Sequence, residues 1–331
     1  MKYSVDFEKE INSMLKNNIG LCPYFRSKHK FLKEYSVHYF WHNQSHLNYG
    51  MSYLRNLLKN ETAFENPLFH ILFKAFVYAE IRFINNFIPQ NSHEERLTGH
   101  LISEISNSLS IIGETFEQKA SQLYNSRVNL EFHYADLSSN DNEKITGADF
   151  GLIFHINLPD YQEKVNVAII QSKKLGKNAL IDLAQIDALK HFAEKSGFYC
   201  FYDMNKNEQY SPLILNANAI TSIFDNDNKD SISYKSKSLQ RDKITDSWNG
   251  GIPLSVFLIL EMLNPENENI ESFRNIHKAK RFIEGQSENV FKDNREHQVS
   301  RVLTVSVGGI SNTNQDLRNL SELFKFQDYE D

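Results

Sequence analysis

The chain has 331 residues, of which 40% are hydrophobic and 24% charged, so it is long enough for one large domain or two smaller ones with a sizeable core. Its formal net charge of −6 argues against a general cationic coat for nucleic acid, so such binding would need a local basic patch or metal ions. The two cysteines, Cys22 and Cys200, form no CxxC pair, so we expect no disulfide framework. The sequence shows neither a signal-peptide pattern nor an apolar run of about eighteen residues, so we expect a cytoplasmic protein with no membrane partner.

Residues 1–90 carry phenylalanine, tyrosine and leucine at helical spacing. Three segments predict helices, namely DFEKEINSMLKN, YGMSYLRNLLKN and NPLFHILFKAFVYAEIRFINNFI. Pro89, in the polar stretch PQNSH, marks a boundary after the third segment. We therefore expect an N-terminal helical domain over residues 1–90, which could bind a partner protein or DNA, or form a homo-oligomer.

Three histidines in this region, His38, His42 and His46, follow one another at intervals of four residues. They would share one face of a helix, and two histidines at that spacing can bind zinc. The intervening residues, YFW and NQS, do not form an HExxH motif. A partly buried aromatic surface is therefore the preferred interpretation over a metal site.

Residues 91–331 predict a second region, in which helices and strands alternate. A helix is expected over 92–112, then a short helix, and a further helix over 179–195 separates the last two strands. The strands are expected near 129–137, 149–158, 164–172 and 198–204. This order predicts an α/β fold with helices on both faces of a mixed sheet, an α/β/α sandwich.

The C-terminal part of the chain is polar at first and then regains regular patterns. Residues 205–250 are rich in Asn, Asp and Ser and predict loops or short hairpins. The segment PLSVFLILEML predicts a helix after residue 252, and a charged helical stretch runs to residue 285. The last regular segment, RVLTVSV, predicts a strand that can extend the same sheet.

One hairpin carries the residues of greatest chemical interest. The segments ITGADFGLIFHINL and VNVAIIQSKKLG read as two strands around the polar turn PDYQEK. Folding about Tyr161 would set Asp149 opposite Lys173. Gln171 would share a face with Lys173, because side chains alternate along a strand. A carboxylate, an amide and an ammonium group are therefore expected to meet at one end of the hairpin.

These three groups suit a site for Mg²⁺ and phosphate. Mg²⁺ prefers oxygen ligands, keeps several waters and needs only one or two protein oxygens besides substrate phosphate. Asp149 would supply charge and Gln171 a neutral carbonyl oxygen. Lys173 would orient the attacking water or stabilise charge on the scissile phosphate. The alternative interpretation is an ordinary polar end of a surface hairpin.

The same residues resemble a known family. The chain has a GAD motif ending at Asp149, then a second strand, then a QSK motif ending at Lys173. This order resembles the motif pattern of the PD-(D/E)XK, or restriction-endonuclease-like, nuclease superfamily, in its variant with Gln before X-Lys. Upstream, ERLT beginning at Glu95 is similar to the family's E-x-x-[LI]-T helix. Downstream, QIDAL beginning at Gln185 resembles its glutamine-bearing helix. The resemblance covers about residues 92–204.

The resemblance implies an endonuclease, dependent on Mg²⁺ or Mn²⁺, that hydrolyses phosphodiester bonds. By this resemblance, the metal is expected to be held by Asp149, Gln171 and Glu95, and Lys173 completes the catalytic set. The chain departs from the name-giving pattern at Ala148, where Pro would stand, and at Gln171, where an acid would stand. DNA is the expected substrate, with RNA as the alternative, and the resemblance implies a role in prokaryotic restriction or antiphage defence.

Several of these residues have competing roles. Ser92 lies three residues before Glu95, so the two could form a capping box that stabilises the helix start. Glu104, beside the apolar stripe of the same helix, is an alternative carboxylate. Gln185 could be an ordinary polar position of an amphipathic helix. Asp136, at the end of an alternating strand, is a weaker candidate for a second carboxylate.

Basic residues that could follow a phosphate backbone lie in three places. They are Lys174 beside the hairpin site, Lys278, Lys280 and Arg281 in HKAKRF, and Lys235, Lys237, Arg241 and Lys243 further upstream. Contacts of this kind position nucleic acid without specifying its sequence. Charge runs are more often solvated faces.

Two other functions remain open. The fold could be a catalytically inactive module that grips nucleic acid through the Asp/Gln/Lys cleft. The chain could also be a helical interaction protein whose α/β part is structural. The metal-dependent nuclease is the preferred hypothesis.

Overall fold

A computed structural model describes residues 19–20, 58–59, 61–64, 66–136, 147–205, 209–227, 235–245, 251–283, 299 and 301–308. Most of the predicted N-terminal helical domain lies outside these residues. Cys22 and the histidines at 38, 42 and 46 lie outside them as well. Those predictions therefore stay predictions.

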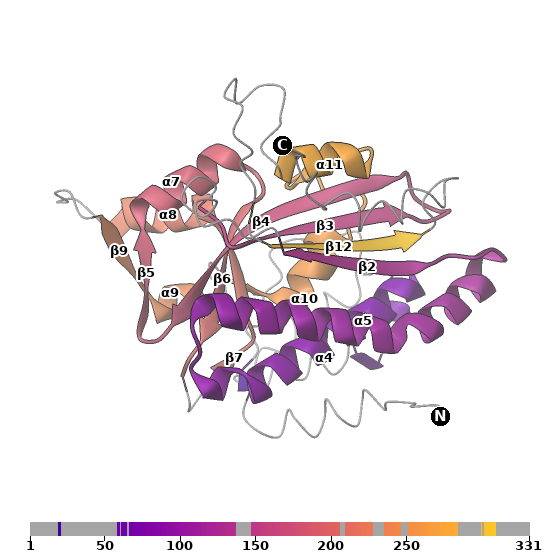
Figure 1. The fold of residues 1–331 in the computed structure, drawn as a ribbon, viewed down its shortest axis with the longest axis horizontal. Helices are drawn as coiled ribbons and strands as arrows, with labels where there is room; N and C mark the ends of the chain where they lie inside the picture. The colour runs from indigo at the N-terminus through magenta and orange to yellow at the C-terminus, as the bar shows by residue number, and fades with distance from the viewer. Residues whose placement is uncertain are drawn as a thin grey trace, which may run out of the picture.

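A mixed sheet crosses the centre of the molecule (Figure 1), and it has eight strands within the described residues. In spatial order they are β10 (Ile252–Pro253), β8 (Leu213–Asn216), β6 (Gly197–Asp203), β4 (Lys164–Leu175), β3 (Phe150–Asn157), β12 (Arg301–Gly308) and β2 (Leu130–Asp136), with β11 (Glu271–Phe273) paired to β4. The pairs β4–β6 and β3–β12 are parallel and the others antiparallel. The C-terminal strand therefore joins the same sheet, where it lies between β3 and β2.

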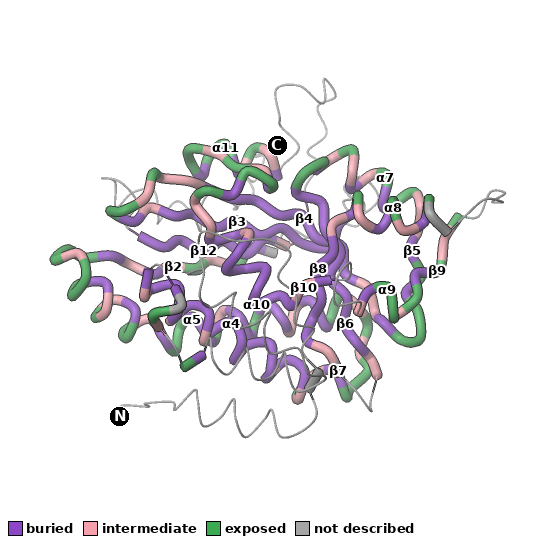
Figure 2. The backbone as a smooth tube through the Cα atoms, turned by 180° about the vertical axis from the view of Figure 1, so that it is seen from behind, coloured by how far each residue is buried: buried purple, intermediate pink, exposed green. Residues whose placement is uncertain are grey.

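The sheet has a hydrophobic core on each face, because its central strands are apolar on both sides. Phe150, Leu152 and Phe154 of β3 belong to one core, whereas Ile153 belongs to the other. The first core packs against α4 (Pro67–Asn86), α5 (Glu94–Tyr124), α10 (Leu254–Phe257) and the π-helical segment η3 (Leu258–Met262). The second packs against α7 (Leu183–Phe192), α8 (Ala217–Asp227) and α11 (Ile276–Ile283). Figure 2 shows the buried backbone running between these helical layers. The predicted α/β class with a mixed sheet is confirmed.

Helices α4 and α5 form an antiparallel pair on one face of the sheet. Asn66 caps α4 by accepting a hydrogen bond from the Leu68 N–H at 2.9 Å, and Pro67 occupies the first turn. Helix α5 runs through the short helix that the sequence predicted after residue 112, so the two are one element. An ion pair of 2.7 Å between Arg82 and Glu104 joins the helices. No helix among the described residues is long and apolar enough to cross a membrane.

The prediction of one helix over 179–195 was wrong in its first turn. That segment opens as β5 (Asn178–Asp182), which pairs with β9 (Ser236–Gln240), and α7 follows it. Side chains of β5 alternate between exposed and buried, which is the period of a strand. Asp182 then caps α7 by accepting hydrogen bonds from two backbone N–H groups of its first turn.

Residues 205–250 are more regular than the predicted loops and hairpins. Their described parts contain β7 (Gln209–Tyr210), β8, α8, β9 and α9 (Arg241–Thr245). β7 pairs with β1 (Ile19–Gly20), and β8 belongs to the main sheet. The elements are too short for a clear periodicity in sequence, so their order depends on tertiary contacts.

A buried carboxyl group joins the helical layer to the C-terminal half of the chain. Glu80 of α4 is 1% exposed, and its Oε1 accepts a hydrogen bond of 2.7 Å from the Ser255 N–H at the start of α10. Its Oε2 is buried and has no hydrogen-bond partner among the described residues. Burial raises the pKa of Glu80 from 4.5 to about 8, so this group keeps its proton at neutral pH.

Glu80 should make the protein less stable as the pH rises. The unfolded chain loses this proton near the ordinary pKa, whereas the folded chain keeps it until about 8, so between about pH 5 and pH 8 the folded state binds more protons. The free energy of unfolding should therefore fall across this range, on the order of a few kcal/mol. Glu80→Gln stays neutral and should lack this loss. Urea unfolding of both proteins across that range measures it, and an equal pH dependence in both would contradict the assignment.

Candidate functional site

The predicted hairpin is formed by β3 and β4, with a shifted register. Phe150 pairs with Ile170, and the Asp149 N–H donates to the Ile170 carbonyl oxygen at 2.9 Å, so Asp149 stands opposite Gln171. The prediction that Lys173 faces Asp149 was wrong. The turn centres one residue earlier than expected, which moves the partner by two residues. A shift of two preserves the face of every side chain, so Gln171 and Lys173 remain on the same face.

Asp149 and Gln171 are in direct contact and both are buried, at 6% and 1% exposure. One oxygen of Asp149, Oδ2, accepts hydrogen bonds from the Ser172 N–H at 2.7 Å and from the Gln171 amide nitrogen at 3.2 Å. That nitrogen also donates to the Ser172 carbonyl oxygen at 3.2 Å. Because both of its partners are acceptors, the amide orientation is fixed.

The carbonyl oxygen of the same amide is left without a donor. Gln171 Oε1 is buried and accepts no hydrogen bond among the described residues. An unsatisfied buried acceptor costs about 1–3 kcal/mol, so a buried oxygen of this kind calls for an explanation such as a bound cation or water. Gln171 thus carries an amide oxygen without a protein donor, on a side chain whose nitrogen contacts the Asp149 carboxylate.

Gly147 holds the GAD motif against α7. Its φ of +65° is a conformation that side-chain-bearing residues rarely adopt. A Cβ at this position would collide with the backbone carbonyl oxygen of Gln185 and lie 3.0 Å from the Leu189 nitrogen. The structure therefore brings α7, with the predicted accessory residue Gln185, next to the residues that precede Asp149.

Glu94, which the sequence analysis did not single out, contacts the two lysines of β4. Its Oε1 accepts a hydrogen bond of 2.9 Å from the Lys174 N–H, and its Oε2 lies 3.8 Å from the Lys173 Nζ. Lys174 also donates through Nζ to Asn91 Oδ1 at 2.7 Å. Glu94 is the first residue of α5, adjacent to the predicted Glu95. The acidic pair at the helix start was the signal in the sequence, but the choice between its members depends on how α5 docks on β4.

Glu95 is exposed and lies at the same cleft. A cleft of about 660 Å³ is lined by His93, Glu94, Glu95, Arg96, Asp149 and Lys174. The alternative role of Glu95 in a capping box with Ser92 is not realised, because α5 is capped at His93 without a side-chain hydrogen bond. Both carboxylates at the start of α5 therefore stand on the cleft into which Asp149 opens.

Three buried hydroxyl groups hold α5 on the sheet at this point. Thr98 Oγ1 lies 2.9 Å from Ser172 Oγ and 2.9 Å from the Tyr202 hydroxyl, and these last two atoms are 3.1 Å apart. Thr98 also donates to the Glu94 carbonyl oxygen at 3.0 Å. Burial raises the pKa of Tyr202 well above its ordinary value, so its hydroxyl stays protonated. The threonine of the ERLT motif thus fixes the distance between the helix start and β4.

Thr98→Val should lower the free energy of unfolding by about 1–3 kcal/mol. Valine has nearly the same volume but no hydroxyl, so Ser172 and Tyr202 can pair only with each other and one of these two buried hydroxyl groups loses its acceptor. Thr221→Val is a matched control. Thr221 is only half-buried. Its hydroxyl donates to the Ala217 carbonyl oxygen of its own helix and accepts a long hydrogen bond of 3.3 Å from the half-buried Lys190 ammonium, so a change below about 1 kcal/mol is expected. Urea unfolding of the three proteins measures both effects, and equal losses would rule out a special role for the hydroxyl cluster.

The remaining predicted residues lie at different distances from the cleft. Asp136 ends β2 opposite Arg301, the first residue of β12, and so lies at the same edge of the sheet, two strands from β3. Glu104 lies ten residues beyond Glu94 on α5, about 15 Å along the helix, in its ion pair with Arg82. The structure does not bring Glu104 to Asp149.

Apart from Lys174, which lines the cleft, the predicted basic residues divide between two places. Lys278, Lys280 and Arg281 lie on α11, on the same face of the sheet as α7. In the other group, Lys235 directly precedes β9, Lys237 lies on β9, and Arg241 and Lys243 lie on α9. There Lys237 stands over the Phe224 ring, and Arg241 pairs with Asp203.

The cleft fits a hard cation such as Mg²⁺. Among the described residues, no group of three or more His, Cys, Asp or Glu side chains is placed to hold a metal ion by itself. Mg²⁺ does not need such a cage, since one or two carboxylates plus substrate phosphate usually suffice. Asp149 and Gln171 Oε1 would supply two oxygens from the hairpin, and Glu94 or Glu95 would supply a carboxylate from α5.

Comparison with known proteins identified no similar protein. The chain matches no protein-family model, and no curated protein or solved structure matches it. The resemblance to the nuclease superfamily therefore rests on the motifs of the chain.

Proposed function

We propose that this protein is a metal-dependent nuclease with a restriction-endonuclease-like core, and that it hydrolyses phosphodiester bonds, with DNA as the expected substrate. The observation that carries the proposal is the buried pair of Asp149 and Gln171. Its amide oxygen has no partner among the described residues, and the pair adjoins a cleft that also receives the carboxylates of α5. A role in restriction or antiphage defence is part of the proposal through the family resemblance alone.

Each residue of the site has a distinct task in this proposal. The Ser172 N–H holds the Asp149 carboxylate at 2.7 Å and so fixes it at the edge of the cleft. Asp149 and Gln171 Oε1 would hold Mg²⁺ together with Glu95 or Glu94. Bound there, Mg²⁺ would neutralise charge on the scissile phosphate and make a nearby water more acidic.

Lys173 supplies a positive charge from a protein side chain, in addition to the charge of the metal ion. Its side chain is 14% exposed, and its Nζ lies 3.8 Å from Glu94 Oε2, which orients the ammonium toward the start of α5. From there it can donate a hydrogen bond to a phosphate oxygen or to the attacking water. A donor placed in advance stabilises the charge that develops as the phosphodiester is attacked.

The test is cleavage of plasmid, linear and single-stranded DNA and of RNA, in Mg²⁺, Mn²⁺ and EDTA. Asp149→Asn removes the charge but keeps an oxygen that can accept from the Ser172 N–H, so it should fold and lose at least about 100-fold in cleavage. Asp225→Asn, at an exposed position of α8, makes the same change away from the cleft and should retain activity. Mn²⁺ titrations monitored by electron paramagnetic resonance should show weaker Mn²⁺ binding by Asp149→Asn than by the wild-type protein, and unchanged binding by Asp225→Asn.

The same experiments separate the rival functions. A folded wild-type protein that binds nucleic acid but cleaves none of the substrates with either metal would be an inactive binding module. A protein that binds neither nucleic acid nor Mn²⁺ would favour the structural, protein-interaction role. Either result would overturn the nuclease proposal.

A further inference from the structure

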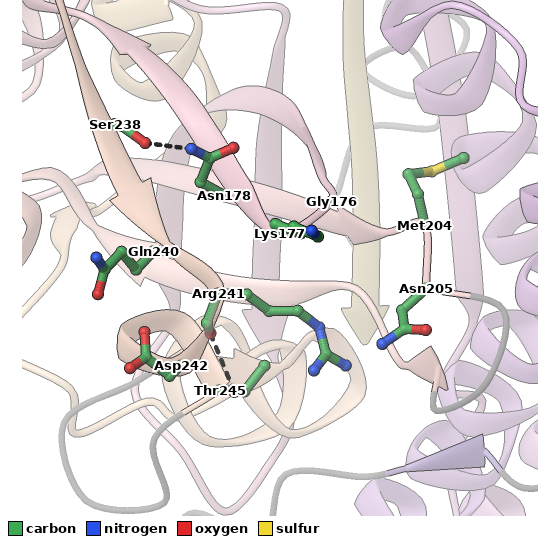
Figure 3. Close-up of a pocket in the computed structure, with 10 residues that line it drawn as sticks. All are labelled: Gly176, Lys177, Asn178, Met204, Asn205, Ser238, Gln240, Arg241, Asp242 and Thr245. Atoms are coloured by element: carbon green, nitrogen blue, oxygen red, sulfur yellow. Dashed lines mark hydrogen bonds between the residues drawn. The ribbon is translucent and has the colours of Figure 1, made fainter.

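A second cavity, of about 900 Å³, opens where β4 leaves the sheet (Figure 3). Its walls are residues 176–177 between β4 and β5, Asn178 at the start of β5, Met204 and Asn205 after β6, and side chains of β9 and α9. Residues more than sixty positions apart in the chain therefore line one cavity. Its volume lies in the range of cavities that bind small organic molecules.

Arg241 forms one wall of this cavity and is held rigidly. Its Nη2 donates to Asp203 Oδ2 at 2.8 Å and its Nε to Asp203 Oδ1 at 3.3 Å, and Asp203 is fully buried. The guanidinium lies 5.0 Å from the centre of the Tyr210 ring. The same carboxylate accepts the N–H groups of Asn205 and Tyr210. A guanidinium fixed in this way loses little conformational entropy when it contacts a ligand.

The other lining groups are polar and of mixed character, and they include one carboxylate, that of Asp242. Lys177 is exposed, and its carbonyl oxygen accepts the Arg241 N–H at 3.0 Å, which keeps the two basic residues on adjoining walls. Carboxamides come from Asn178, Asn205 and Gln240. Figure 3 shows Lys177 and the Arg241 guanidinium between Asn205 on one side and Gln240 on the other, with the Gln240 amide turned away from the guanidinium. Lysine and arginine suit a phosphate, and carboxamides can donate to and accept from the edge of a nucleobase.

The cavity and the candidate site are separate openings near the same end of β4. Lys173 and Gly176 are three residues apart at the end of β4, about 10 Å in an extended strand. That distance corresponds to about three base-pair steps of B-DNA. Lys174 lines the cleft of Asp149, and Gly176 begins the wall of the second cavity. A nucleic-acid strand lying across the end of β4 would reach both.

The geometry points to a nucleotide-binding subsite. The cavity at Lys177 and Arg241 binds a nucleotide of the substrate strand, about three steps from the bond cleaved at Asp149 and Lys173. Lys177 contacts a phosphate, and the carboxamides contact the base or sugar. This assignment rests on the proposed nuclease function, because the strand must also cross the cleft. It predicts that this cavity contributes to affinity and to any sequence preference.

The test measures binding of fluorescein-labelled 20-nucleotide probes by anisotropy, in EDTA and again in Mg²⁺ with the Asp149→Asn protein. The probes are duplex DNA, single-stranded DNA and RNA, and AMP serves as a free-nucleotide competitor. Lys177→Glu is compared with Lys195→Glu, an equal charge change at an exposed position before β6, at the opposite end of that strand. Gln240→Ala removes one carboxamide without a charge change.

Lys177→Glu should weaken binding of at least one probe by about 10-fold or more and lower the salt dependence by about one counterion, whereas Lys195→Glu should change affinity less than about 2-fold. Gln240→Ala should weaken binding by about 10-fold with the salt dependence unchanged. Equal affinities for Lys177→Glu and Lys195→Glu would overturn the subsite. Binding of AMP that Lys177→Glu abolishes, with oligonucleotide binding unchanged, would overturn its assignment to the substrate strand.

The outcomes also separate this subsite from the proposed function. Metal-dependent cleavage by the wild-type protein, with unchanged affinity in Lys177→Glu, would overturn the subsite alone. Selective loss of binding in Lys177→Glu, in a chain that never cleaves, would support the subsite and overturn nuclease activity. Failure of the folded wild-type protein to bind any probe would overturn both.

Discussion

Replacement of Lys173 by methionine should lower phosphodiester cleavage by at least about 100-fold while the protein stays folded. Loss of one donor aimed at developing charge typically costs 100-fold to 1,000-fold in rate, about 3–4 kcal/mol. Lys173 is suited to this role because its ammonium lies beside Glu94 at the end of the strand that carries Gln171. Initial rates at saturating substrate and Mg²⁺, for the wild-type and variant proteins, measure the effect.

The fold should tolerate this change. The Lys173 contact with Glu94, at 3.8 Å and partly exposed, is worth less than about 1 kcal/mol, and methionine keeps most of the side-chain stem. Lys173→Arg should also be impaired, because a planar guanidinium does not reproduce the compact charge of an ammonium. Lys195→Met is the control for loss of a lysine and should retain activity. Wild-type rates in Lys173→Met would exclude this residue from catalysis.

Gly147→Ala should lower the free energy of unfolding by at least about 2 kcal/mol. The left-handed conformation alone costs a side-chain-bearing residue about 1–2 kcal/mol. The new Cβ would also collide with the Gln185 carbonyl oxygen of α7, and backbone cannot move aside as a flexible side chain can. Because Asp149 follows two residues later, the shift needed to relieve the collision should displace its carboxylate and lower cleavage as well. Thermal and urea unfolding measure the stability.

Gly113→Ala is the matched control for this substitution. Gly113 lies inside α5, and a Cβ there would meet no atom within 4 Å. Alanine should therefore raise the free energy of unfolding by about 0.5–1 kcal/mol, since glycine is unfavourable inside a helix. The same chemical change is thus expected to have opposite signs at the two positions. Stabilisation by Gly147→Ala would show that the helix and the GAD motif are not locked together at this contact.

The site residues predicted from sequence were located by local patterns. The apolar segments on either side of the PDYQEK turn placed Asp149, Gln171 and Lys173 at one end of a hairpin, and the alternation of side chains assigned Gln171 and Lys173 to one face. That assignment survived the two-residue error in register because the period of a strand is two. The register itself depends on where the turn centres, and a polar six-residue turn does not fix its own centre.

The carboxylate beside the lysines could not be chosen from the sequence. Glu94 and Glu95 both belong to the first turn of α5, and a helix turns by about 100° per residue. Which of them faces β4 is therefore set by the docking of the helix through Thr98, Ser172 and Tyr202, residues up to about a hundred positions apart.

The sequence by itself determined the α/β class, the main strands, the apolar helix α4 and the face shared by Gln171 and Lys173, because these follow from periodicities within a few residues. Tertiary structure alone decided the place of β12 between β3 and β2, the contact of Glu94 with β4 and the cavity shared by Lys177 and Arg241. Each of these joins residues distant in the chain. Their positions follow from the packing of whole elements, and no local pattern encodes that packing.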